Sequence, residues 1–266
     1  MKKVLKSVIA GTSMLFFATS LANAHFLLLK PSKDNVEGSS SPRIKLEAIF
    51  THPMEGGPNM DFKIIDSGAV INGHKFPLHW RAHLIRAMKG SKHMVHMYTT
   101  NFLIRRPGVY TFYVNPSAYY EPEEQKFIKQ ITKVYVEAYG LEEGWDKPIG
   151  LKAEIIPLIK PFAIWEGNTF RGRVLFNGKP AANIDVEVEY LNVGHRVKPP
   201  ADSFITQVVK TDENGYFEYT IPWAGWWGFS AIGYGGKKIG PGGKEYPIEL
   251  DAVMWVKAYP KPRRVR

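Results

Sequence analysis

The chain has 266 residues, a formal net charge of +10, eight histidines and no cysteine. The lack of cysteine excludes disulfides and thiolate ligands, so any metal site must use histidine, methionine, carboxylate or amine donors. A basic balance alone could indicate a nucleic-acid partner. The secretory leader described next argues against nucleic acid and leaves loose attraction to anionic surfaces.

Residues 1–24 have the features of a cleaved secretory signal. Three lysines precede an apolar run over residues 8–18, which is too short to span a bilayer. Ala22 and Ala24 then supply the small-x-small cleavage pattern. We therefore expect an exported, periplasmic protein whose mature chain begins at His25.

The rest of the chain has strand patterns in two groups. Alternation of apolar and polar residues predicts short antiparallel strands at 109–114, 185–191 and 216–222, each bounded by turn-forming residues. We predict a mainly β protein built from two antiparallel β-sandwich units, immunoglobulin-like or transthyretin-like. The N-terminal unit, 25–150, would carry the metal site, and the C-terminal unit would comprise 151–266.

One stretch has the start of a helix. In EPEEQKFIKQITKVYVEAYG, residues 121–140, a proline and acidic residues stand where a helix would begin. The second half, KVYVEAY, alternates and is equally compatible with a strand. We place the single short helix of the fold here.

His25 is the residue on which the functional prediction rests. After the cut it would carry a free amine, whose pKa near ~8 lets it lose its proton when a metal binds. The amine and the imidazole Nδ1 then close one chelate ring, and such nitrogen donors suit Cu(II), Ni(II), Co(II) and Zn(II). The alternative is that cleavage merely happens to precede a histidine. The apolar FLLLKP that follows should hold the new terminus in a sheet, which favours the first interpretation.

A second ligand is predicted at His52. Strands at 26–30 and 43–51 can pair antiparallel, which places the end of the second beside the start of the first. His52 would then approach His25 and give three nitrogens in a T-like set, with Glu55 as a fourth, oxygen ligand. The other interpretation of His52 is a polar residue that caps a strand end.

Residues 73–102 contain five further histidines and three methionines. A Lys-Gly-Ser-Lys turn at 89–92 predicts a hairpin, so most of these side chains are interpreted as an ordinary polar sheet face with methionines in the core. A mixture of His and Met would also suit a soft ion. His96 is kept as a reserve ligand. The predicted metal-ligand set is His25, His52, Glu55 and His96.

Several motifs occur in the order seen in one protein family. They are HFLLLKPS (25–32), FTHPMEGGPNMDF (50–62), EIIPL (154–158), GNTFRGRVLFNGKP (167–180) and TDENGYFEYTIPWAGWWGF (211–229). In these stretches the chain resembles the periplasmic component family of cobalt and nickel uptake systems, long catalogued as a domain of unknown function. Its C-terminal half also resembles carboxypeptidase-regulatory, transthyretin-like sandwiches. The first resemblance implies a non-enzymatic carrier that hands Ni²⁺ or Co²⁺ to a membrane importer subunit, with His25 and His52 at matching positions.

Two other functions fit parts of the sequence. An N-terminal histidine plus one internal histidine on a β-sandwich is also the copper site of lytic polysaccharide monooxygenases, for which Tyr98 or Tyr110 would be the axial aromatic residue. A metal-free adhesion or scaffold sandwich would need only the basic charge and the aromatic content. We expect the metal carrier, with Cu²⁺ or Zn²⁺ as the alternatives to Ni²⁺ or Co²⁺.

Overall fold

A computed structural model of the protein describes residues 25–262, so the predicted signal lies outside the described residues. Strands dominate this part of the chain, and its helical segments are two short 3-10 turns, η1 (Asp202–Phe204) and η2 (Pro241–Gly243). The prediction of a mainly β, antiparallel sandwich fold is confirmed. Within the described range, no helix has both the length and the apolar character needed to cross a membrane.

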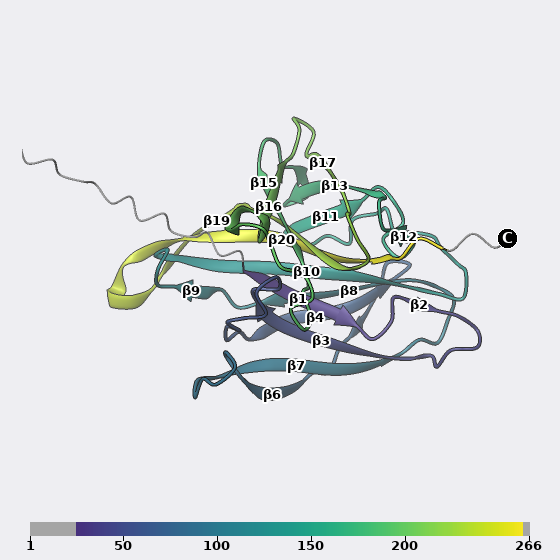
Figure 1. The fold of residues 1–266 in the computed structure, drawn as a ribbon, viewed down its shortest axis with the longest axis horizontal. Coiled ribbons are helices and arrows are strands. Elements are labelled where there is room, and N and C mark those ends of the chain that lie inside the picture. The colour runs from purple at the N-terminus through teal and green to yellow at the C-terminus, as the bar shows by residue number, and fades with distance from the viewer. Residues whose placement is uncertain (1–24, 263–266) are drawn as a thin grey trace, which may run out of the picture.

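Three sheets are stacked as layers (Figure 1). The first outer sheet has the order β1 (Phe26–Pro31), β3 (Arg43–Thr51), β7 (Met94–Leu103) and β6 (Arg81–Arg86). The second outer sheet contains β11 (Ala153–Pro157), β13 (Thr169–Phe176), β14 (Lys179–Pro180) and β17 (Tyr216–Thr220).

The central sheet lies between them and is the largest. Its main path runs through β16 (Gln207–Lys210), β15 (Asp185–Tyr190), β18 (Gly225–Ala231), β20 (Glu245–Tyr259), β10 (Lys126–Ala138), β8 (Gly108–Pro116), β4 (Ile64–Ile71) and β5 (His74–Pro77). Four short strands extend it by pairing with β10 or β20, namely β2 (Asn35–Val36), β9 (Tyr119–Glu121), β12 (Ile164–Trp165) and β19 (Tyr234–Ile239).

The middle strands of the central sheet are buried on both faces. On β20, Val253 and Trp255 belong to the core shared with the first outer sheet, whereas Ala252 and Met254 belong to the core shared with the second. Successive side chains of a strand point to opposite faces. A strand between two layers therefore needs apolar residues at nearly every position, as the run Ala252–Val256 has.

The helix expected within 121–140 is wrong, because most of this segment is strand β10. Like β20, β10 contributes to both cores, with Ile131 and Tyr135 on one face and Val134 on the other. Burial on both faces removes the clear alternation that identifies a half-exposed strand. Pro122 and the acidic residues after it form the turn between β9 and β10 instead of a first helical turn.

The two predicted units meet in the central sheet. β10 of the first unit and β20 of the second pair in parallel along residues 127–134 and 248–255. A buried ion pair, Lys133 Nζ to Glu154 Oε1 at 2.8 Å, also crosses between them. A division near residue 150 thus separates the strands of the two outer sheets, whereas each core contains residues from both sides of it.

Candidate functional site

His25 and His52 lie side by side at one end of the first outer sheet. The register of β1 and β3 pairs Phe26 with Thr51, so the residues just beyond these partners are neighbours. The two imidazole centroids are 4.5 Å apart, and the residues are only 8% and 3% exposed. The predicted approach of His52 to His25 through an antiparallel strand pair is confirmed, and we refer to these residues as the histidine pair.

The main chain at the start of β1 is held by Gln130 of β10. Gln130 Oε1 accepts the Leu27 N–H at 2.6 Å, and Gln130 Nε2 donates to the His25 carbonyl oxygen. The same Nε2 donates to Asp251 Oδ2 at 3.1 Å, which ties the amide to β20. Trp255 Nε1 donates to the Leu27 carbonyl oxygen at 3.1 Å. These contacts fix the first residues of β1 against the central sheet.

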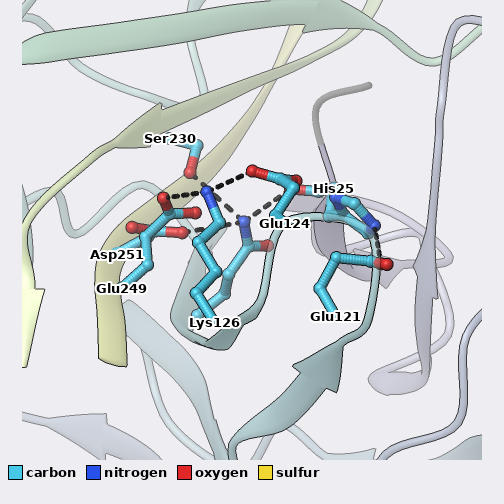
Figure 2. A network of polar contacts seen from close by, with 8 residues as sticks. His25, Glu121, Glu124, Lys126, Ser230, Glu249 and Asp251 are labelled. Carbon is cyan, nitrogen blue, oxygen red and sulfur yellow. Dashed lines mark hydrogen bonds and ion pairs between the residues drawn. The ribbon is translucent and has the colours of Figure 1, made fainter. Parts of the chain in front are cut away.

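The imidazole of His25 is oriented by Glu121 (Figure 2). His25 Nε2 donates to Glu121 Oε2 at 3.1 Å, and the Glu121 side chain is only 12% exposed. Since an ionised carboxylate only accepts hydrogen bonds, the His25 ring acts as the Nε2–H donor in this contact. Carboxylates that orient a histidine in this way are common around protein metal sites.

The sequence does not predict a role for Glu121 in the site, because residues 121–140 resemble the start of a helix. In the structure Glu121 ends β9 and pairs with Lys126 of β10 across a tight turn. The sequence signal for this arrangement is the Pro-Glu-Glu-Gln turn between two aromatic-containing segments, which is typical of a hairpin. The hairpin brings a carboxylate 96 positions away in sequence to the side of His25.

Aromatic rings surround the histidine pair. The ring centroids of Phe50 and Tyr119 lie 5.8 and 6.3 Å from that of His25. Partial burial, together with the nearby Glu121 carboxylate, raises the pKa of Tyr119 to about 12. Its phenol therefore keeps its proton at neutral pH.

The two tyrosines considered from the sequence for a copper site have structural contacts elsewhere. The Tyr98 hydroxyl donates to the Phe62 carbonyl oxygen, and the Tyr110 hydroxyl donates to the Arg106 carbonyl oxygen, both at 2.9 Å. Tyr119 is the tyrosine whose ring lies beside the histidine pair.

The loop after His52 is held by the C-terminal unit. The Met54 N–H donates to Glu189 Oε2 at 3.1 Å, and Asn192 Nδ2 donates to the Met54 carbonyl oxygen at 3.1 Å. The Asn192 N–H donates to the Pro53 carbonyl oxygen at 3.1 Å. Burial raises the pKa of Glu189 to about 8. The histidine pair thus lies where the two units meet, although both histidines belong to the first.

The structure does not bring Glu55 and His96 to the histidine pair. Glu55 is exposed in the turn after His52. His96 lies on β7, where its Nδ1 is 2.8 Å from Asp61 Oδ1 and its N–H donates to the same oxygen. Among residues 25–262, no three His, Cys, Asp or Glu side chains form a group that could hold a metal ion.

The other histidines of the 73–102 segment lie around an exposed hairpin. β6 and β7 pair antiparallel, with Leu84 opposite His96, which confirms the hairpin predicted around the turn at 89–92. His83 Nε2 is 2.8 Å from Thr99 Oγ1 on the neighbouring strand. The histidines of this segment are exposed or half-buried, as predicted for most of them. The expectation that its methionines lie in the core is wrong, because Met88 and Met94 are exposed at the tip of the hairpin.

Fold and site together define a three-layered, all-β protein with a buried pair of histidines at the start of its first described strand. The sequence model of a family described as "Domain of unknown function (DUF4198)" matches residues 22–235, and the chain belongs to this family. A search of curated proteins found no match.

Solved structures include two distant likenesses. The D00-D0 domain of intimin is 13% identical, with 87% of this chain and 100% of that chain covered and a TM-score of 0.21. BcpA, the major pilin subunit of Bacillus cereus, is 9% identical, with 89% and 71% covered and a TM-score of 0.21. At these TM-scores neither likeness bears on function.

Proposed function

We propose that the protein is an exported, periplasmic carrier that binds a transition-metal ion, nickel or cobalt, and delivers it to a membrane uptake system. One observation carries the proposal. The histidine pair is buried, with ring centroids 4.5 Å apart, at the residue where the predicted signal cut would create a new N-terminus. Glu121 supports it by orienting the His25 ring through Nε2, as carboxylates commonly do for histidines that bind metal ions.

The amine of His25 is the third donor in this proposal. Side chains within residues 25–262 supply no three-membered metal group, so the histidine pair needs a main-chain donor. Cleavage after Ala24 would expose an amine that closes a chelate ring with Nδ1 of the same residue. The complete site would then exist only after export, away from cytoplasmic metal ions.

The donor set narrows the choice of ion. Two imidazoles and an amine suit Co(II), Ni(II), Cu(II) and Zn(II) and do not suit hard ions such as Mg(II) or Ca(II), which take oxygen ligands. The resemblance to cobalt and nickel uptake components favours nickel or cobalt within this group. A carrier also has to release its cargo, and a site with few protein ligands makes transfer to an importer subunit easier.

A copper protein of the histidine-brace type is the second candidate. Tyr119 favours it, because its ring centroid lies 6.3 Å from that of His25. In an oxidase of the lytic polysaccharide monooxygenase type, such a ring would limit access to one face of the copper ion.

The test starts from mature protein with an authentic His25 N-terminus. Calorimetric titration with Ni²⁺, Co²⁺, Cu²⁺ and Zn²⁺ is repeated on three variants: one with an extra Met before His25, His52→Ala and, as a matched control, His96→Ala. We expect the first two changes to abolish tight binding and the control to leave it intact. Peroxide production with copper and ascorbate would favour the copper alternative over the carrier. Unchanged affinity in both the extended protein and His52→Ala would refute both candidates.

A further inference from the structure

A second candidate binding site lies at the opposite end of the first outer sheet. It is a cavity of about 530 Å³ between the β4–β5 hairpin, the end of β7 and the turn before β8. Leu103 on its wall pairs with Arg43 at the start of β3, whereas His52 follows the end of β3. At about 3.3 Å per residue, the two sites are separated by roughly 25 Å along this strand.

The body of the cavity is apolar and aromatic. Phe102 and Tyr110 pack edge to face with centroids 5.7 Å apart, and Phe76, Leu78 and Leu103 line it with them. Phe76 is 44% exposed, so its ring offers apolar surface to a bound molecule. A volume in the range of 300–1,000 Å³ with a mostly apolar lining is typical of small-molecule sites.

The wall at Arg105 and Arg106 is fixed in place by the floor of the cavity. The Tyr110 hydroxyl donates to the Arg106 carbonyl oxygen at 2.9 Å and accepts the Arg106 N–H at 3.3 Å. This reciprocal pair of hydrogen bonds holds the turn before β8 against the aromatic floor, so the cavity does not depend on a loose loop.

The ionisable side chains that line the cavity are basic or histidine, apart from the phenol of Tyr110. Arg105 and Arg106 line the cavity together with His74 and His79, and no Asp or Glu is among the lining residues. In the part of the chain that the structure describes, neither guanidinium has a carboxylate partner. Lys75 on the adjacent strand, by contrast, is paired with Asp66 at 2.9 Å. An unpaired guanidinium beside an apolar cavity is suited to bind a carboxylate or sulfonate in a forked geometry.

We propose that this cavity binds a small organic anion that combines an apolar, preferably aromatic, body with one carboxylate or sulfonate group. The body packs on Phe102 and Tyr110 and the acid group pairs with Arg105 or Arg106. This proposal does not depend on the histidine pair. A failure of either proposal would therefore leave the other unaffected.

The experiment compares two fluorescent probes that differ in charge. 8-Anilinonaphthalene-1-sulfonate carries the acid group, and N-phenyl-1-naphthylamine is its uncharged counterpart. Each is titrated into the wild-type mature protein, the double variant Arg105→Gln/Arg106→Gln and the cavity-filling variant Leu103→Trp. Arg171→Gln, on β13 in the other unit, controls for the loss of a positive charge elsewhere. Thermal melts confirm that the variants fold.

We expect the double variant to bind the sulfonate at least about tenfold more weakly, because each charge-assisted hydrogen bond contributes more than 1.4 kcal/mol. Binding of the neutral probe should be little changed by it. Leu103→Trp should weaken both probes, and Arg171→Gln and His52→Ala should weaken neither. Equal affinity of the sulfonate for the wild type and the double variant would overturn the proposal, as would retention of both probes in a folded Leu103→Trp protein.

Discussion

The histidine pair and the β6–β7 hairpin use the same residue type in opposite surroundings. Five of the eight histidines lie within residues 73–102, and three of these, His83, His93 and His96, belong to the hairpin. There they are exposed or half-buried, and His83 and His96 form local hydrogen bonds. The histidine pair is buried and is supported by residues from β9, β10 and the C-terminal unit. The comparison teaches that local density of ligand residues does not make a site. A site requires burial and the convergence of residues that are distant in sequence.

The strongest test of this comparison removes the histidines of each region in turn. In mature protein, we expect His25→Ala to lower Ni²⁺ affinity by more than the 10–100-fold typical of losing an outer partner of a ligand. Replacing His79, His83, His93 and His96 together by Ala should leave that affinity unchanged, since these residues are exposed or bonded locally. Calorimetric titration measures both. A loss of tight binding in the quadruple variant alone would reverse the comparison.

Each region has a carboxylate beside a histidine, Asp61 beside His96 and Glu121 beside His25, and the next test concerns Glu121. We expect Glu121→Gln to lower metal affinity by about 10–100-fold, because the His25 ring would lose the charged acceptor that orients it. Glu123→Gln, an exposed neighbour on the same turn, is the matched control. Equal effects of the two substitutions would mean that Glu121 acts only through overall charge.

A smaller effect is expected on the strand that carries His25. Gln130→Leu would leave the buried Leu27 N–H and His25 carbonyl oxygen without their partner, which should lower the free energy of unfolding by about 1–3 kcal/mol. Urea unfolding of the metal-free protein measures it. Glu123→Gln should leave the unfolding midpoint unchanged. If Gln130→Leu also leaves it unchanged, the anchoring role of Gln130 is contradicted.

The last test compares the two regions by the pH dependence of stability. Burial raises the pKa of Glu189 from 4.5 to about 8. Between these values the folded state binds the proton more tightly than the unfolded state, so this group makes the protein less stable as the pH rises from about 4.5 to 8. The slope approaches about 1.4 kcal/mol per pH unit for one proton.

Glu189→Gln should flatten this part of the pH–stability curve, and the exposed Glu218→Gln should not. The hairpin carboxylate behaves in the opposite sense. Although partial burial works against it, hydrogen bonds from His96 hold the pKa of Asp61 below its ordinary value. Urea unfolding at pH 5 and pH 8 measures the effect. Identical slopes for wild type and Glu189→Gln would contradict the role assigned to Glu189.

The position of His52 beside His25 follows from local sequence. The apolar strand after His25 and the strand ending at Thr51 predict an antiparallel pair, and that pair is sufficient to place His52 beside His25. The sequence predicts Glu55 as a ligand because it follows His52 closely in the chain. The turn exposes it instead, since proximity along the chain does not fix the direction of a side chain.

The sequence by itself determined the β class, the pairing of β1 with β3 and the approach of His52 to His25. These features depend on alternation and on contacts across one short connection. The sequence also predicts an export signal. Only the tertiary structure decided that residues 126–138 form a central strand, that Glu121 orients His25 and that Glu189 holds the loop after His52. The last two contacts join residues 96 and 135 positions apart. Such contacts depend on how three layers stack around one shared sheet, and hydrophobic periodicity records that a residue is buried without recording which distant residue it meets.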